Sequence, residues 1–342
     1  MTLWYPSEPS NDRAPYGLSG PGLKRFIYHH LVRTHAGRDT ALAANGERFP
    51  LLLYVAGWGS DGDANTVLAT DLASHGYVVA ALSDTEFDRP PVARLTGAAD
   101  FSSAQAFAST GHLARAKIEY ESQRAIAVLD RMVALDASDP NHRFTGRLRL
   151  DRVGIFGFSL GGAVALETCN RVLRCAGALD FDGYLWDVRK ARALPYFLIS
   201  DLEPPPSPAE LTSSDPATYY TAHMDAADGL VQQANLSSGG YLLQIAGANH
   251  LNFTDVPLFS PVQRLKSGVS PTRVAQIVDS YVLAFFETSV KDRPGPLLEL
   301  QARQPKGVRF TGYPFPSRRR RASLRFRAEA IATRFALSTI GI

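Results

Sequence analysis

One serine of the chain stands where it could act as a nucleophile. Residues 157–162 read GFSLGG, which fits the pattern G-x-S-x-G with Ser159 at its centre, between an apolar segment and a stretch of small residues. On a sharp strand-to-helix turn the serine backbone is strained, which is tolerated because Gly157 and Gly161 have no side chains to clash. The hydroxyl then projects at a helix N-terminus, where backbone N–H groups can stabilise an oxyanion. We therefore interpret Ser159 as a nucleophile rather than as part of a tightly packed helix start without chemistry.

A serine hydroxyl needs a general base, which is usually a histidine held in place by a carboxylate. With the chain order serine, acid, histidine that accompanies this serine pattern, His223 and His250 are the two histidines downstream of Ser159. His223 lies in the polar stretch YYTAHMDAAD, which favours a surface or lid position. His250 lies in QIAGANHLNFTD, directly after an apolar strand, and we predict that it is the base. The alternative is an ordinary loop histidine.

Three carboxylates compete for the role of the acid. Asp180 and Asp182 lie in LDFDGYLW at the end of one predicted strand, and Asp201 lies in YFLISDLEPP at the end of the next. Many hydrolases with this serine pattern take the acid from the later strand. Spacing within a single sequence does not separate the three candidates.

The elements that must position these residues follow from the hydrophobic pattern. Continuous apolar runs predict strands buried on both faces, as in a parallel sheet, and segments with helical spacing separate them. Predicted strands cover 49–55, 77–84, 152–158, 175–181, 196–200 and 241–247, and predicted helices cover 66–76, 114–135, 161–173 and 270–290. The chain from Arg89 to about Gly111 is predicted to be irregular. This alternation predicts an α/β fold: a doubly wound, mostly parallel sheet with helices on both faces.

A single α/β domain is expected over residues 1–293. A proline-rich insertion over about residues 202–236 is expected to lie over the C-terminal edge of the sheet, where such folds place their ligand sites. Residues 294–342 are expected to form an extension outside the main core, ending in a basic tail. We interpret that tail as solvated, with a weak contact to an anionic surface as the alternative.

Charge and composition exclude several classes of protein. The formal net charge is +3, yet residues 317–342 hold seven arginines and one glutamate, so the preceding residues carry a net −3. The body of the protein is therefore not expected to bind nucleic acid. The sequence has no apolar run long enough to span a bilayer, and MTLWYPSEPS is not a secretory signal. We expect a soluble cytoplasmic protein, or a secreted one if a signal has been trimmed away.

No metal or cofactor site is expected. Cys169 and Cys175 are six residues apart and form neither a disulfide framework nor a metal-ligand pattern. Each is interpreted as a small buried residue, with its redox state left open. Asp61 and Asp63 lack the glycine and glutamate spacing of a calcium loop.

Four stretches of the chain together resemble the plasma-type platelet-activating-factor acetylhydrolases and their bacterial, dienelactone-hydrolase-like relatives. They are GFSLGG, LRCAGALDFDGYLW, GANHLNFTD and the long stretch that begins FPLLLYVAGWGSDG. The resemblance covers roughly residues 45–290 and implies an α/β-hydrolase fold and an ester hydrolase. In that family the acid ends the strand after the nucleophile helix, so the resemblance favours Asp182 over Asp201 and Asp180. The family's H-N-F also matches HLNF at 250–253, apart from one inserted position.

The same resemblance implies an oxyanion hole built from two backbone N–H groups. The family takes one from the residue after the nucleophile and one from a loop often written H-G-x-G, which gives Leu160 and Trp58 here, the latter within AGWG at 56–59. Two side chains depart from the family. Ala56 replaces the histidine of that loop, and Phe158 precedes the nucleophile where relatives commonly have histidine. The departures put in doubt the hydrogen-bond support of the loop and the choice of substrate.

Together these features predict a serine carboxylic-ester hydrolase that works through an acyl-enzyme on a small-molecule or lipid ester, with short-acyl esters as the first expectation. A lactone, a polyester or a peptide ester is the alternative substrate, because a fold does not fix a substrate. A second class of function, a hydrolase-fold protein that binds its ligand without turning it over, is supported only by Ala56 and Phe158.

Overall fold

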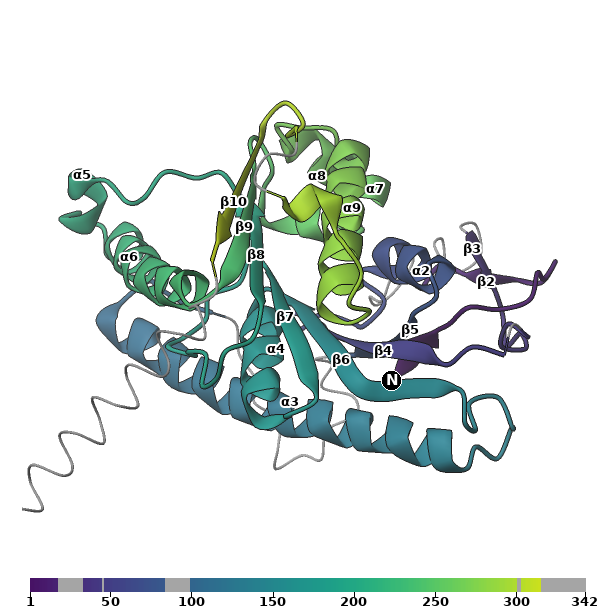
Figure 1. Ribbon diagram of the computed structural model, residues 1–342. Coiled ribbons are helices and arrows are strands. Elements are labelled where there is room, and N and C mark those ends of the chain that lie inside the picture. The colour runs from purple at the N-terminus through teal and green to yellow at the C-terminus, as the bar shows by residue number, and fades with distance from the viewer. Residues whose placement is uncertain (18–32, 45, 84–98, 300–302, 315–342) are drawn as a thin grey trace, which may run out of the picture.

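A mixed eight-stranded sheet with the order β1-β5-β4-β6-β7-β8-β9-β10 forms the centre of the molecule (Figure 1). The computed structural model describes residues 1–17, 33–44, 46–83, 99–299 and 303–314. Six strands run parallel: β4 (Phe49–Val55), β5 (Val78–Leu82), β6 (Leu148–Phe158), β7 (Cys175–Phe181), β8 (Tyr196–Asp201) and β9 (Gly240–Ile245). The antiparallel edge strands are β1 (Thr2–Trp4) and β10 (Val308–Tyr313), and a separate pair joins β2 (Arg13–Pro15) to β3 (Arg33–Gly37). This order confirms the predicted doubly wound, mostly parallel sheet.

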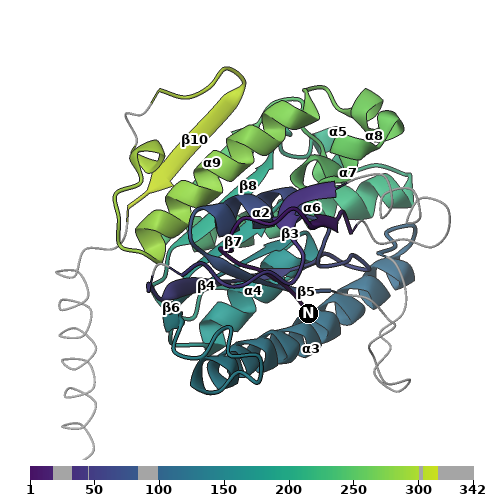
Figure 2. The same ribbon diagram turned by 90° about the vertical axis from the view of Figure 1, so that its right-hand side faces the viewer.

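Helices cover both faces of the sheet, as the first two views show (Figures 1 and 2). One face carries α3 (Ala104–Ala137), α4 (Leu160–Arg171) and α6 (Pro216–Ser237), and the other carries α2 (Thr66–Ser74) and α9 (Pro271–Ser289). Successive side chains of a strand point to opposite faces. In β4, Leu51 and Leu53 accordingly join the apolar cluster of the first face, and Leu52 and Tyr54 join that of the second. Apolar residues at every position of β4 are therefore needed to fill both layers.

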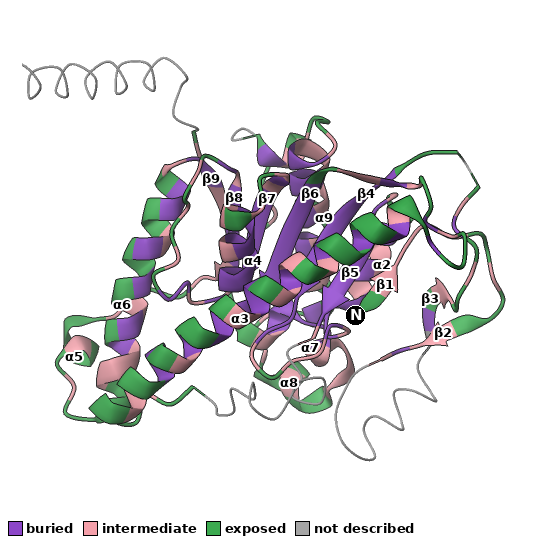
Figure 3. Cartoon of the chain, turned by 90° about the horizontal axis from the view of Figure 1, so that it is seen from below, coloured by how far each residue is buried: buried purple, intermediate pink, exposed green. Residues whose placement is uncertain are grey.

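The longest helix, α3, crosses one face of the sheet with a single buried stripe (Figure 3). Ala114, Ile118, Ala125 and Leu129 are buried at helical spacing, while the opposite side is exposed. The helix begins at Ala104, earlier than predicted, because the Ser103 side chain accepts a hydrogen bond from the third helical N–H and caps the N-terminus. Within the described part of the chain, no helix is both long and apolar enough to cross a membrane.

Short elements complete the connections between the main helices and strands. They are α5 (Pro208–Leu211), η3 (His250–Phe253), α7 (Val256–Phe259), α8 (Pro261–Lys266) and η4 (Pro296–Leu298). The proline-rich segment predicted as an insertion begins after β8 and continues through α5 into α6. Helix η3 follows β9 at the C-terminal edge of the parallel strands, so this edge carries both the insertion and the loop of the predicted base.

The last described strand corrects one prediction. Residues from 294 onward were expected to lie outside the main core, but β10 pairs with β9 in continuous register and closes one edge of the sheet. Phe310 is buried, stacks on Tyr241 with ring centroids 5.9 Å apart, and contacts Tyr281. In the sequence VRFTGY of β10 the apolar residues are separated by polar residues and a glycine, so the strand gives no continuous apolar run, which is why the pattern missed it. The arginine-rich tail lies outside the described residues, and its solvation stays a prediction.

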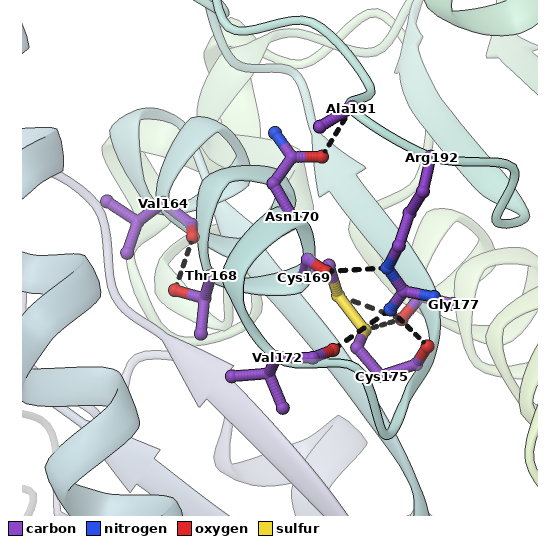
Figure 4. The surroundings of a disulfide bond; sticks show 9 residues. All are labelled: Val164, Thr168, Cys169, Asn170, Val172, Cys175, Gly177, Ala191 and Arg192. Carbon is purple, nitrogen blue, oxygen red and sulfur yellow. Dashed lines mark hydrogen bonds between the residues drawn. A yellow bond between two sulfur atoms is a disulfide. The ribbon is translucent and has the colours of Figure 1, made fainter.

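The two cysteines also differ from expectation. Both are buried, as predicted, but a disulfide bond joins Cys169 near the end of α4 to Cys175 at the start of β7 (Figure 4). The short turn between the two elements brings their Cα atoms to 5.2 Å, which is within the range that a disulfide bridges. The Arg192 guanidinium donates hydrogen bonds to the carbonyl oxygens of Cys169, Val172 and Cys175 and so fixes the turn.

Candidate active site

Ser159 occupies the turn between β6 and α4 with a strained backbone. Its φ of 55° and ψ of −126° fall in a region that residues with a Cβ rarely adopt. A Cβ at Gly157 would lie 2.1 Å from the carbonyl oxygen of Gly161, and a Cβ at Gly161 would lie 2.2 Å from that of Val55. The Ser159 N–H donates to the carbonyl oxygen of Phe181 at 2.8 Å, which ties the turn to the end of β7. The turn therefore requires glycine on both sides of the serine.

Asp182 and His250 form a direct pair at the same edge of the sheet. Oδ2 of Asp182 lies 2.7 Å from Nδ1 of His250, so a proton on Nδ1 makes a hydrogen bond to the carboxylate. Asp182 directly follows β7 and also has a φ of 55°, and its side chain is only 14% exposed, against 46% for that of His250. Its N–H donates to the carbonyl oxygen of Ile199 in β8, which anchors the carboxylate to the neighbouring strand.

The other two candidate acids occupy different positions. Asp180 is fully buried within β7, where Tyr196 Oη donates to its carboxylate at 3.0 Å and the Gly183 N–H at 3.1 Å. Burial raises the pKa of Asp180 well above its usual value. Asp201 ends β8 and donates its backbone N–H toward Oδ1 of Asp182 at 3.4 Å. Among the described residues, the carboxylate hydrogen-bonded to His250 is that of Asp182.

A half-buried, acidic environment distinguishes Asp201. Burial, together with the nearby charges of Asp182 and Glu203, raises its pKa to about 7. Its carboxylate lies in the cavity that also contains His250. Asp201 is therefore a second carboxyl group at the site, with a raised pKa.

One cavity of about 1230 Å³ joins all the predicted site residues. Its lining includes Ser159, Asp182, His250, Trp58 and Leu160, together with prolines 204–206 and residues of α6. Leu160 is the first residue of α4, so its N–H lies at the helix N-terminus. The loop after β4 runs against the turn that carries Ser159, since a Cβ at Gly57 would lie 3.2 Å from Cβ of Ser159. His223 does not line this cavity, and it lies beside the carbonyl oxygen of Leu211.

Two further contacts hold the histidine in place. The ring of Phe158 packs on that of His250 with centroids 4.6 Å apart, so the residue that departs from the family pattern supports the imidazole. Asn249 and Asn252 exchange side-chain and backbone hydrogen bonds at the start of η3 and fix the turn that carries His250. The spacing of these asparagines in ANHLN is the signal that could have revealed this cap.

Helix α6 holds the loop that follows Asp182, which the sequence did not indicate. Oδ1 of the buried Asp228 accepts the N–H groups of Leu185 at 2.8 Å and Trp186 at 3.1 Å. Gln232 Nε2 donates to the carbonyl oxygen of Gly183. Nothing in the pattern of α6 marks these polar residues as inward-facing, because their partners come from another segment of the chain. Among the described residues, no group of histidine, cysteine and carboxylate side chains is arranged to hold a metal ion.

Comparisons with known proteins agree with this architecture. No family model matches the chain. The chain is 24% identical over 204 residues to the platelet-activating factor acetylhydrolase of Canis lupus familiaris, covering 52% of this chain and 46% of that one. It is 26% identical over 217 residues to that of Bos taurus, covering 53% and 49%. The chain therefore spans about half the length of these curated relatives.

A solved structure resembles nearly the whole fold. The ferulic acid esterase from Streptomyces cinnamoneus superposes with a TM-score of 0.63 at 24% identity, covering 90% of this chain and 87% of the other. The resemblance stated from the sequence is confirmed by these relatives. The protein therefore has the α/β-hydrolase fold and is related in sequence to the platelet-activating factor acetylhydrolases.

Proposed function

We propose that the protein is a carboxylic ester hydrolase that works through an acyl-enzyme. Ser159 is the nucleophile, His250 the general base and Asp182 the carboxylate that orients the imidazole. The observation that carries the proposal is the 2.7 Å contact between Asp182 and His250, in the same cavity as the strained Ser159 turn. A packing serine would not require this strain beside an ordered histidine and carboxylate pair.

The proposed reaction proceeds in two stages. Nε2 of His250 removes the Ser159 hydroxyl proton while Oγ attacks the ester carbonyl carbon, and the same proton then passes to the departing alcohol. In the second stage His250 takes a proton from water, the hydroxide attacks the acyl carbon, and the proton returns to Oγ as the acid leaves. Asp182 holds the proton on Nδ1 and stabilises the imidazolium in both stages.

The tetrahedral oxyanion needs donors that are in place before the reaction. The N–H groups of Leu160 and Trp58 are the proposed pair. Leu160 stands at the N-terminus of α4, where the helix dipole favours negative charge, and the loop of Trp58 runs against the serine turn. The departures at Ala56 and Phe158 leave both backbone donors unchanged, because neither N–H belongs to those residues.

The proposed substrate is a small-molecule or lipid ester with a short acyl group. This choice is supported by the similarity to acetylhydrolases, while lactones and polyesters are the alternatives within the same chemistry. A panel of p-nitrophenyl esters, short-acyl phospholipids, lactones and a soluble polyester, compared by kcat/KM, separates these classes. Preference for the lactone or polyester would replace the short-acyl assignment and leave the acyl-enzyme mechanism in place.

The test of the mechanism is removal of the nucleophile. Ser159→Ala is expected to abolish hydrolysis of p-nitrophenyl acetate and labelling by a fluorophosphonate, with an unchanged circular dichroism spectrum as the control for folding. Wild-type activity in this variant would refute the proposal. A wild-type protein that neither hydrolyses esters nor reacts with the fluorophosphonate would instead indicate a ligand-binding protein.

A further inference from the structure

A second, smaller cavity lies beside the catalytic cavity. It has a volume of about 280 Å³ and lies between α3 and α6. Trp186 and Asp228 line both cavities, so the loop after Asp182 forms the wall between them. Asp228 accepts hydrogen bonds from the backbone of this loop, so a substitution there would displace the loop. The Trp186 side chain can be shortened without removing these hydrogen bonds.

The wall is held rigidly. Trp186 is 8% exposed and has a φ of 50°, and its N–H donates to Asp228. The indole packs edge-on against the ring of Tyr184, with ring centroids 5.9 Å apart. Its centroid lies 6.5 Å from that of the Phe101 ring. An indole fixed by its backbone and by two aromatic neighbours does not swing aside at low cost.

The smaller cavity is lined mainly by apolar groups. Phe107, Met224 and Val231 lie in its wall, and the latter two side chains are buried. His112, Arg115, Asp187 and Asp228 also line it, but most of the exposed lining surface is apolar. Gly111 adds free space, because the nearest atoms that a Cβ built there would meet belong to the Arg115 guanidinium, at 3.5 Å or more. Such a cavity fits an unbranched hydrocarbon chain better than a polar group.

We propose that Trp186 sets the length of the apolar chain that the catalytic site accepts. The indole closes the catalytic cavity toward α3 and α6, and an ester chain directed to that side stops against it. Without the indole, the chain would continue into the smaller cavity. This inference rests on the proposed esterase function, and it assigns to Trp186 a role in specificity that is distinct from the chemistry at Ser159.

The experiment measures chain-length profiles. The kcat/KM of wild type, Trp186→Ala and Trp186→Leu is determined for p-nitrophenyl esters from butyrate to dodecanoate, and for acetates of alcohols of the same lengths, below the concentrations at which they aggregate. Burial of each methylene is worth about fourfold. We therefore expect the ratio of long-chain to short-chain kcat/KM to rise about tenfold or more in Trp186→Ala, in the acyl or the alcohol series, and by less in Trp186→Leu.

A matched substitution tests the route of the chain. Gly111→Leu fills the smaller cavity and is favourable in a helix. In the Trp186→Ala background it should return the ratio toward that of wild type, and alone it should leave the ratio unchanged. A ratio within twofold of wild type in both Trp186 variants, or a gain that Gly111→Leu fails to reverse, would overturn the proposal.

The outcome separates this inference from the proposed function. Hydrolysis of the butyrate ester by wild type, lost in Ser159→Ala, establishes the esterase whatever the variants of Trp186 do. Unchanged chain-length profiles would then refute only the proposed role of Trp186 and leave the esterase function in place. If wild type hydrolyses none of these esters, the inference about Trp186 falls, and the proposed function falls with it if no lactone or polyester is hydrolysed either. Trp186→Leu keeps more of the buried volume and serves as the folded variant if Trp186→Ala does not fold.

Discussion

At the scale of single residues, the site concentrates backbone strain. Ser159, Asp182 and Trp186 all have φ between 50° and 55°, although none of them is glycine. Each such residue costs about 1–3 kcal/mol and persists only where its surroundings hold it. A Cβ at Gly183 would lie 2.1 Å from the carbonyl oxygen of Ser159, so the loop after Asp182 (residues 183–186) is in tight contact with the Ser159 turn. The strain is therefore shared between the two turns that carry the proposed chemistry.

The choice between the two acids is testable at this scale. Asp182→Asn should lower kcat by about four orders of magnitude, because an amide neither holds the Nδ1 proton in the same way nor stabilises the imidazolium. Asp201→Asn should lower it by less than about tenfold, since its carboxylate is not bonded to His250. Steady-state kinetics on the two folded variants decides the assignment. A severe loss in Asp201→Asn alone would move the role of acid to that residue.

The raised pKa of Asp201 predicts how the stability of the protein depends on pH. Its pKa in the folded protein is raised to about 7 by burial, and an unfolded aspartate ionises near 4, so the unfolded chain binds fewer protons between these values. The stability contributed by the protonated group is therefore present below about pH 4 and is lost as the pH rises to about 7. Because the side chain is only half-buried, solvent screening reduces the effect to about 1 kcal/mol.

Urea unfolding at pH 5 and pH 8 measures this effect. Asp201→Asn removes the titration, so its stability relative to wild type should improve by about 1 kcal/mol between pH 5 and pH 8. A relative stability that stays constant, or moves in the opposite direction, would show that Asp201 does not carry a raised pKa.

At the scale of elements, helix α6 holds the loop after Asp182 (residues 183–186) in place through hydrogen bonds. Asp228, Gln232 and Asp225 bind backbone or side-chain groups of residues 183–186. The helix lies in the segment predicted as an insertion, and it also lines the catalytic cavity. One element therefore both shapes the substrate space and fixes the loop next to Asp182.

The contribution of that support can be measured at Asp228. Asp228→Ala leaves the buried N–H groups of Leu185 and Trp186 without an acceptor, which should cost about 2–4 kcal/mol in the free energy of unfolding and lower kcat by displacing the loop. Asp228→Asn retains an acceptor oxygen at the same place and is the matched control. Urea titrations and kinetics on both variants test this. Equal losses in the two variants would show that the negative charge, rather than the acceptor, matters.

At the scale of the whole molecule, β10 forms one edge of the sheet and covers β9. The strand pairs along the whole of β9 and places Phe310 on the aromatic cluster of Tyr241 and Tyr281. An uncovered β9 would expose unpaired N–H and carbonyl groups, which favour aggregation. The segment beyond residue 293 therefore contributes to the sheet rather than only following it.

Truncation tests this contribution. A chain that ends at Arg303 loses β10 and should unfold at lower temperature and elute from size-exclusion chromatography as aggregate, since loss of the buried Phe310 alone costs about 3–5 kcal/mol. A chain that ends at Pro314 keeps the strand and should retain the melting temperature and elution volume of the full chain. If the shorter chain behaved like the longer one, β10 would not be part of the stable core.

Local patterns in the sequence determined a large part of this architecture. The nucleophile turn was visible because its requirement for glycine lies within five adjacent residues, and the parallel strands were visible because burial on both faces demands continuous apolar runs. The predicted helices fell where the apolar spacing placed them. Their ends did not follow from the spacing, as the start of α3 at Ala104 shows, because a single cap such as Ser103 decides an end.

What remained open depended on contacts between distant segments. Asp182 and Asp201 end neighbouring parallel strands, so no spacing distinguishes them, and only the 2.7 Å approach of His250 does. Three other features also depend on contacts between separate segments of the chain. They are the disulfide bond, the pairing of β10 with β9, and the hydrogen bonds from the loop after Asp182 to Asp228. By itself the sequence determined the Ser159 turn and the parallel strands, because these follow from neighbouring residues. Only the tertiary structure decided which carboxylate meets the histidine, because that choice depends on how strands far apart in the chain are packed.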